Sequence, residues 1–162
     1  MARASFIWLL AGAVAGATMM IDEALPGAWR AWIGPTHGHA LFVGWFVQFA
    51  VGIAYWLLPR KRSPERPLGY DERLALLAVT MLNAGLLLRV AAEPAQRSGH
   101  DGGWTTPVLG ASGALQAGAF AIFVVQLWSR AAPRGARPAF TTPAERQENV
   151  PASRRHRQEQ TP

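Results

Sequence analysis

The sequence predicts an all-α membrane protein, a bundle of four transmembrane helices. Three observations predict it: four long apolar segments, no apolar–polar alternation within them, and an uneven distribution of basic residues among the loops that join them. The chain has 162 residues, of which 50% are hydrophobic, and a formal net charge of +6. Because it contains no cysteine, disulfides, thiolate metal sites and cysteine nucleophiles are excluded.

Four segments are long enough to cross a bilayer, which takes about 20 mostly apolar residues and at least about 17. They cover residues 5–21, 40–58, 74–90 and 108–128. Since the bilayer core offers no water to bond peptide groups, apolar runs of this length must be helical. We therefore expect one four-helix transmembrane domain over residues 1–130.

The first of these segments also resembles a signal peptide. "MARASFIWLLAGAVAGA" has a basic start, an apolar stretch and an Ala-Gly-Ala that could be cut. We expect the segment to be retained, because its apolar character continues through residues 19–21. Cleavage would leave three helices in the same orientation.

Basic residues predict how the helices are oriented. Nine flank the cytoplasmic ends in this reading: Arg3, Arg60, Lys61, Arg62, Arg66, Arg73, Arg130, Arg134 and Arg137. The two opposite loops contain only Arg30 and Arg97. The positive-inside rule then places both termini in the cytoplasm of a bacterial inner membrane. Membrane orientation accounts for the basic charge, so the expected partner is the lipid bilayer and not a nucleic acid.

The tail, residues 131–162, differs from the rest of the chain. It holds five prolines, six arginines and three glutamates. Such a segment cannot bury enough apolar surface to fold alone. We expect a disordered, basic cytoplasmic tail, held near anionic headgroups by its arginines.

Small residues predict where helices meet, because lipid provides no hydrophobic drive between them. The motifs are Gly12-xxx-Gly16, Gly44-xxx-Gln48-xxx-Gly52 and Gly110-xxx-Ala114-xxx-Gly118. The stretch before the second span, residues 27–34, places Trp29 and Trp32 at i and i+3. This spacing suits one short interfacial turn, or a lid over the outer ends of the spans.

Ionisable residues near the outer ends are candidates for function, because charges inside a membrane are costly. Arg89 and Glu93 are spaced to pair across one helical turn. On a regular helix His37 would point into the bundle and His39 would point aside, so the two could not chelate one ion. His100 lies in the loop before the last span. Each also has a plain role: a snorkelling arginine, interfacial histidines, a solvated loop residue.

The second span resembles a known family. "HGHALFVGWFVQFAVGIAYWLLPR" is similar to the second helix of the heme-copper oxidase subunit I superfamily, nearest to the nitric oxide reductase branch and small four-helix relatives. The likeness rests on His37, Trp45, Gly52, Tyr55, Leu58 and Pro59. In that family the histidine is an axial ligand of a low-spin heme b. The interval from His37 to Trp45 is one residue longer here, so both His37 and His39 remain candidates.

The resemblance implies heme b as the cofactor. His37 or His39 would be an iron ligand, and His100, or His37 of a second copy, would be the other. Gly44 and Gly52 would open space for the macrocycle, and Arg89 would pair with a propionate. The dinuclear site of the superfamily needs further histidines on later helices, and the spans here have none. An oxidase or reductase active site is therefore not expected from this chain alone.

These features lead to one functional hypothesis and two alternatives. The first is an inner-membrane protein with heme b near its outer leaflet, for electron transfer or redox or ligand sensing, acting as a homodimer or beside a larger respiratory complex. The second is a cofactor-free scaffold or accessory subunit. The third is a periplasm-facing Zn or Cu site on His37, His39 and His100.

Overall fold

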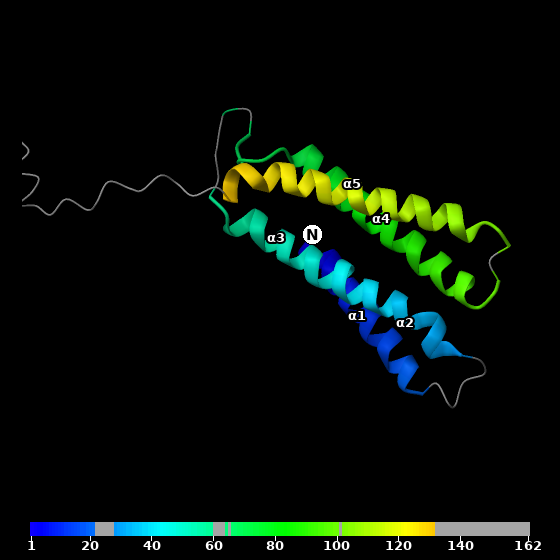
Figure 1. Ribbon diagram of the computed structural model, residues 1–162. Coiled ribbons are helices and arrows are strands. Elements are labelled where there is room, and N and C mark those ends of the chain that lie inside the picture. The colour runs from blue at the N-terminus through cyan, green and yellow to red at the C-terminus, as the bar shows by residue number, and fades with distance from the viewer. Residues whose placement is uncertain (22–27, 60–63, 65, 101, 132–162) are drawn as a thin grey trace, which may run out of the picture. The chain divides into compact units, whose positions relative to one another are not determined.

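The computed structural model describes residues 1–21, 28–59, 64, 66–100 and 102–131, and all regular elements among them are helices (Figure 1). They are α1 (Ala2–Met20), α2 (Trp29–His39), the π-helix η2 (Ala40–Val47), α3 (Gln48–Leu57), α4 (Glu72–Arg97) and α5 (Thr105–Ala131). The disordered tail is expected over residues 131–162; Ala131 is the last residue of α5, and residues 132–162 lie outside the described residues.

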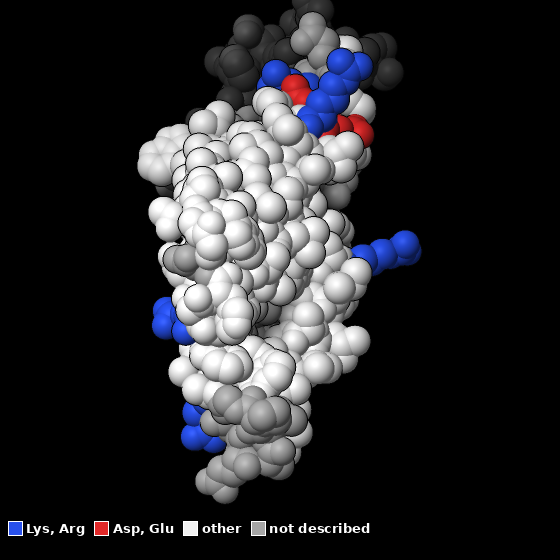
Figure 2. Space-filling view, turned by 90° about the vertical axis from the view of Figure 1, so that its right-hand side faces the viewer, with Lys and Arg blue, Asp and Glu red and all other residues white. Residues whose placement is uncertain are grey.

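Four helices are long and apolar enough to cross a membrane: Ala2–Met20, Trp29–Leu57, Glu72–Arg97 and Thr105–Trp128. This finding confirms the all-helical class and the prediction of four helices with the length and composition of membrane spans. Large apolar side chains such as Phe42, Leu87 and Trp128 are exposed on the helices. In Figure 2 the face toward the viewer is mainly uncharged; acidic and basic side chains gather toward one end, and further basic side chains project from the edges. An exposed apolar surface of this kind suits lipid.

The second span is longer than its apolar run. α2, η2 and α3 form one continuous helix, which begins at Trp29 and not at residue 40. Hydropathy misses the first turns because Arg30, Thr36, His37 and His39 are polar. The short interfacial turn expected around Trp29 and Trp32 is instead the start of this long helix.

α4 and α5 share the most extensive contact of any helix pair in the described fold. Gly85 permits it, since a Cβ there would lie 2.9 Å from the Ser112 carbonyl oxygen. The Ser112 hydroxyl donates to the Gly85 carbonyl at 2.7 Å, and Gln116 Nε2 donates to the Ser112 hydroxyl at 2.9 Å. Leu82 and Leu86, which lie on α4 beside Gly85, are fully buried. A small residue and one interhelical hydrogen bond, which Gln116 supports from within α5, thus replace the hydrophobic drive that lipid does not provide.

α1 packs on the second span through Trp8. A Cβ at Gly44 would lie 2.6 Å from Trp8 Cγ, so the indole occupies the space that this glycine leaves. Trp8 Nε1 donates to Asn83 Oδ1 of α4 at 2.7 Å. On α1 itself, Gly12 and Gly16 lie against side chains of the second span. The predicted contacts at Gly12, Gly16 and Gly44 are confirmed.

Arg130 joins the end of α5 to the end of α3. The side chain is buried, and its guanidinium donates to the carbonyl oxygens of Tyr55 (2.9 Å), Leu58 (2.8 Å) and Pro59 (3.2 Å). The guanidinium also lies 5.8 Å from the ring centroids of Tyr55 and Tyr70. The last carbonyls of a helix have no partner within it. Arg130 therefore caps α3 in addition to its predicted part in orientation.

Gly44→Ala is expected to lower the free energy of unfolding by about 1–3 kcal/mol, because the new methyl overpacks against Trp8. Thermal unfolding in detergent, followed by circular dichroism, measures the loss. Gly110→Ala is the matched control, since a Cβ there meets nothing within 4 Å. It should leave stability unchanged or raise it by up to about 1 kcal/mol. Equal effects at both sites would contradict the packing described for α1.

Arg130→Ala is expected to cost about 1–3 kcal/mol of unfolding free energy, because the α3 carbonyls lose a charged donor. Arg130→Lys should recover only part, since an ammonium lacks the planar fork. Arg97→Ala, an exposed arginine in the last turn of α4, should change stability by no more than about 0.5 kcal/mol. The same thermal assay applies, and a loss for Arg97→Ala as large as that for Arg130→Ala would contradict the cap.

Candidate functional site

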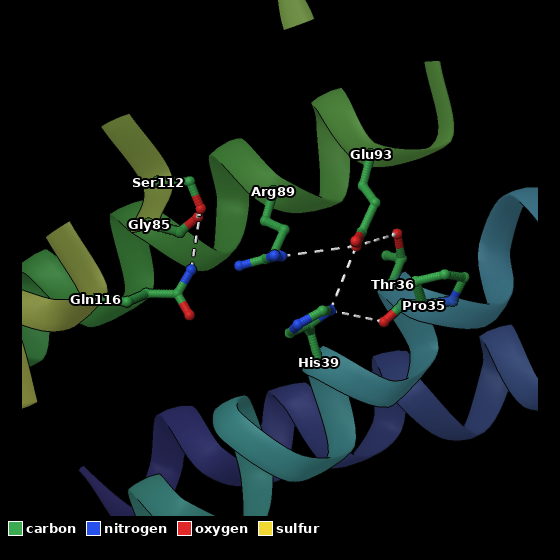
Figure 3. A network of polar contacts seen from close by, with 8 residues as sticks. All are labelled: Pro35, Thr36, His39, Gly85, Arg89, Glu93, Ser112 and Gln116. Carbon is green, nitrogen blue, oxygen red and sulfur yellow. Dashed lines mark hydrogen bonds and ion pairs between the residues drawn. The ribbon is translucent and has the colours of Figure 1, made fainter. Parts of the chain in front are cut away.

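A group of polar side chains joins α2 to α4, and we refer to Thr36, His39, Arg89 and Glu93 as the Glu93 cluster (Figure 3). The Glu93 side chain is buried, and its Oε2 accepts a hydrogen bond from the Thr36 hydroxyl at 3.3 Å. His39 Nδ1 lies 3.4 Å and Arg89 Nε 3.7 Å from the same oxygen. The ion pair predicted between Arg89 and Glu93 is confirmed.

The charges in the Glu93 cluster compensate one another only in part. A buried carboxylate is costly in apolar surroundings unless it is paired, and Arg89 provides the opposite charge. Yet Arg89 Nε is buried without a hydrogen bond, and Arg89 donates none to any other described residue. With 27% of its side chain exposed, the guanidinium keeps N–H groups that an anionic group could use.

His39 is held by one ring nitrogen. Its Nδ1 lies 2.8 Å from the Pro35 carbonyl oxygen, one helical turn back, and also faces Glu93. The tautomer with its proton on Nδ1 satisfies this carbonyl and leaves a lone pair on Nε2. Within the described residues Nε2 has no hydrogen-bond partner. An imidazole oriented through one nitrogen by a carbonyl and a carboxylate, with the other free, is typical of metal-ligating histidines.

His37 contacts α1, whereas His39 contacts α4. Its Nδ1 is 2.8 Å from the Gly12 carbonyl oxygen of α1, and its ring covers Gly16, whose added Cβ would lie 2.9 Å from Cε1. The two histidines therefore face different helices. The expectation that His39 points aside is wrong, because α4 lies on that side of α2 and brings Glu93 to 3.4 Å from His39 Nδ1.

A second feature lies beside the Glu93 cluster, a pocket of about 490 Å³ that we call the aromatic pocket. Its lining residues are Trp8, Ala11, Ala15, Trp29, Trp32, Ile33, Thr36, Ala40, Val90, Pro94, Ala95, Ser98 and His100. Trp29 and Trp32 pack against each other at 6.0 Å between ring centroids. His100 lines the pocket, and its Nδ1 lies 3.2 Å from the Ser98 hydroxyl.

The predicted site residues thus separate into several places. His39 and Arg89 share the Glu93 cluster, His37 lies against α1, and His100 lines the aromatic pocket. The space beside Gly44 holds the Trp8 indole, and a Cβ at Gly52 would lie 3.2 Å from Met1 Cβ. The structure gives both glycines a packing position, and their role beside a macrocycle stays a prediction. Over residues 1–21, 28–59, 66–100 and 102–131, no three His, Cys, Asp or Glu side chains form a group able to hold a metal.

Two site residues, Thr36 and Trp8, went unnoticed in the sequence, and only Thr36 had a detectable signal. Thr36 begins a run of buried positions spaced by four, which continues with Ala40, Gly44 and Gln48. That spacing marks the buried stripe of the second span and would have extended it upstream. Trp8 has no such signal, because nothing local shows which glycine it covers.

No family model, curated protein or solved structure matches this chain. The likeness of the second span to the heme-copper oxidase superfamily therefore stays a prediction from its residues, and function is argued from the site.

Glu93→Gln and Arg89→Gln are each expected to destabilise the protein, because each leaves the other charge without its partner. The double variant should lose less than the sum, with a coupling of about 0.5–2 kcal/mol, at the lower end because Arg89 is partly exposed. Thermal unfolding of the four proteins in detergent measures this coupling.

Arg97 provides the control, since it too lies four residues from Glu93 but forms no ion pair within the described part of the chain. Glu93→Gln and Arg97→Gln should be additive. Additivity for Glu93 with Arg89 as well would contradict the ion pair.

Proposed function

We propose that this chain is a multi-pass protein of the bacterial inner membrane that binds heme b through His39, near the outer leaflet, for electron transfer or for redox or ligand sensing. The observation that carries the proposal is the anchoring of His39: Nδ1 lies 2.8 Å from the Pro35 carbonyl and 3.4 Å from the buried Glu93 carboxylate, while Nε2 has no partner among the described residues.

The donor chemistry of His39 fits an iron ligand. A neutral imidazole is the commonest protein ligand of heme iron, and a hydrogen bond at its other nitrogen fixes the tautomer and the ring orientation. Glu93 would also make the imidazole a stronger donor. The resemblance of the second span supports the same end of the helix, and between its two histidines the local geometry favours His39. His37 Nδ1 contacts a carbonyl oxygen but no carboxylate among the described residues, and its ring lies against Gly16.

Arg89 is suited to pair with the propionates of such a cofactor. A heme carries propionates, and an arginine whose guanidinium has unused N–H groups pairs strongly with a carboxylate. α4 places Arg89 one turn from Glu93, so the cation stays oriented without being fully satisfied. When bound, the heme would supply a reversible one-electron couple at its iron. The protein residues would hold it, orient it and balance its charge.

The distribution of basic residues supports the proposed location in the membrane. The excess of basic residues on one side of the spans favours cytoplasmic termini, which places the Glu93 cluster toward the outer leaflet. A second protein ligand would come from a larger respiratory complex, since His100 lines the aromatic pocket and His37 lies against α1.

A cofactor-free scaffold or accessory subunit is the second candidate. It is favoured by the bonds that tie helices to one another, Trp8 to Asn83, Ser112 to Gly85 and Arg130 to the end of α3. Such bonds stabilise a bundle whether or not a cofactor is present. A Zn or Cu site on His37, His39 and His100 finds less support, because these residues lie against different neighbours.

The heme proposal is tested by expression in a heme-replete bacterium, purification in mild detergent and absorption spectra of the oxidised and reduced protein. A Soret band with reduced α and β bands is expected, and His39→Ala should abolish it. His37→Ala is the matched control, two residues away, and should retain at least half of the heme, about a twofold change at most. Arg89→Gln should weaken heme retention, because a charge-assisted bond to a propionate is lost.

A wild-type protein that is folded and colourless, and that takes up no added hemin, would contradict the proposal and favour the scaffold. Loss of the band in His37→Ala with retention in His39→Ala would move the ligand to His37. Stoichiometric Zn or Cu by elemental analysis, without a Soret band, would favour the metal site.

A further inference from the structure

The lining of the aromatic pocket suits a planar ligand. Three indoles line it, Trp8 from α1 and Trp29 and Trp32 from α2. Much of the remaining wall is small, with Ala11 and Ala15 of α1 among the lining residues. Indoles present broad flat faces, and alanines leave the space between them open. This combination favours a planar ring over a branched or bulky ligand.

Polar groups are few and come from different elements. Thr36 belongs to α2, while Ser98 and His100 follow the end of α4. The Thr36 hydroxyl already donates to Glu93, so it can accept a hydrogen bond from a ligand. His100 Nδ1 lies 3.2 Å from Ser98 Oγ, and Nε2 has no partner in the part of the chain that the structure describes. The pocket thus offers hydrogen-bonding positions on two elements.

The wall contains no Lys, Arg, Asp or Glu among its described lining residues. A charged ligand would find no counter-ion there, and burial of an unpaired charge is costly. A neutral ligand with polar atoms on a ring suits the pocket better. Because the lining helices belong to candidate membrane spans, a ligand dissolved in the bilayer would have direct access.

We propose that the aromatic pocket binds the ring of a lipid-soluble quinone or hydroquinone. The ring would lie among the indoles, with ring oxygens bonded to Thr36 and His100. An acyl chain fits the observations less well, because it would leave both polar groups without a bond and could not stack on the indole rings. The site is distinct from the proposed heme site, since neither His39 nor Arg89 lines the pocket, and it does not depend on heme binding.

The test uses the full chain in nanodiscs and decylubiquinone as the probe, with bound quinone measured by tryptophan quenching and by extraction and chromatography. Exchange of Trp29 and Trp32 together for leucine should weaken binding about tenfold, since two stacking faces are lost. Ala95→Leu, which fills the pocket and removes no indole, should weaken it as well. Trp104→Leu is the matched control, because Trp104 is exposed and lies outside this pocket; its affinity should match the wild type.

Equal affinities in all variants would show partition into lipid and overturn the proposal. Competition by palmitate at equal concentration would do the same and make the occupant an acyl chain. Loss of a Soret band in the Trp29 and Trp32 variant would place heme in this pocket and also overturn it. His39→Ala should bind decylubiquinone normally. A colourless wild type that binds the quinone specifically would therefore contradict the heme proposal and leave this one standing.

Discussion

The interaction on which the candidate site depends is the burial of the Glu93 carboxylate between α2 and α4. A carboxylate in apolar surroundings must be paired or hydrogen-bonded. Here it takes a hydrogen bond from Thr36 and faces His39 and Arg89, at 3.3, 3.4 and 3.7 Å. This requirement fixes how the second span lies against the third, and it orients the histidine whose other nitrogen is free. The same contact that stabilises the helix pair therefore produces the site.

The Glu93 cluster and the aromatic pocket share one residue. Thr36 lines the pocket and also bonds Glu93. The Thr36 hydroxyl therefore couples the pocket to the Glu93 cluster. If both proposals hold, a lipid-soluble redox carrier and a heme would lie on the two sides of this threonine.

Other polar groups of the helices serve packing, because a polar group in apolar surroundings needs a hydrogen-bond partner. Trp8 bonds Asn83, Ser112 bonds the Gly85 carbonyl, and Arg130 bonds the last carbonyls of α3. Each joins two helices that lipid alone would not hold together. These bonds also show why a polar residue inside a span is weak evidence for a ligand: most of those described here already have a protein partner.

The sequence by itself determined the helical class, the four spans and the Arg89–Glu93 pair, because apolar length and i, i+4 spacing are local properties of one segment. Only the tertiary structure decided the rest. That His39 meets Glu93 while His37 meets Gly12 depends on α4 and α1 lying on different sides of α2. That Trp8 fills the space beside Gly44 depends on which helix lies next to α1. Contacts between segments far apart in the chain have no local signature, so the sequence could name the polar residues but not their partners.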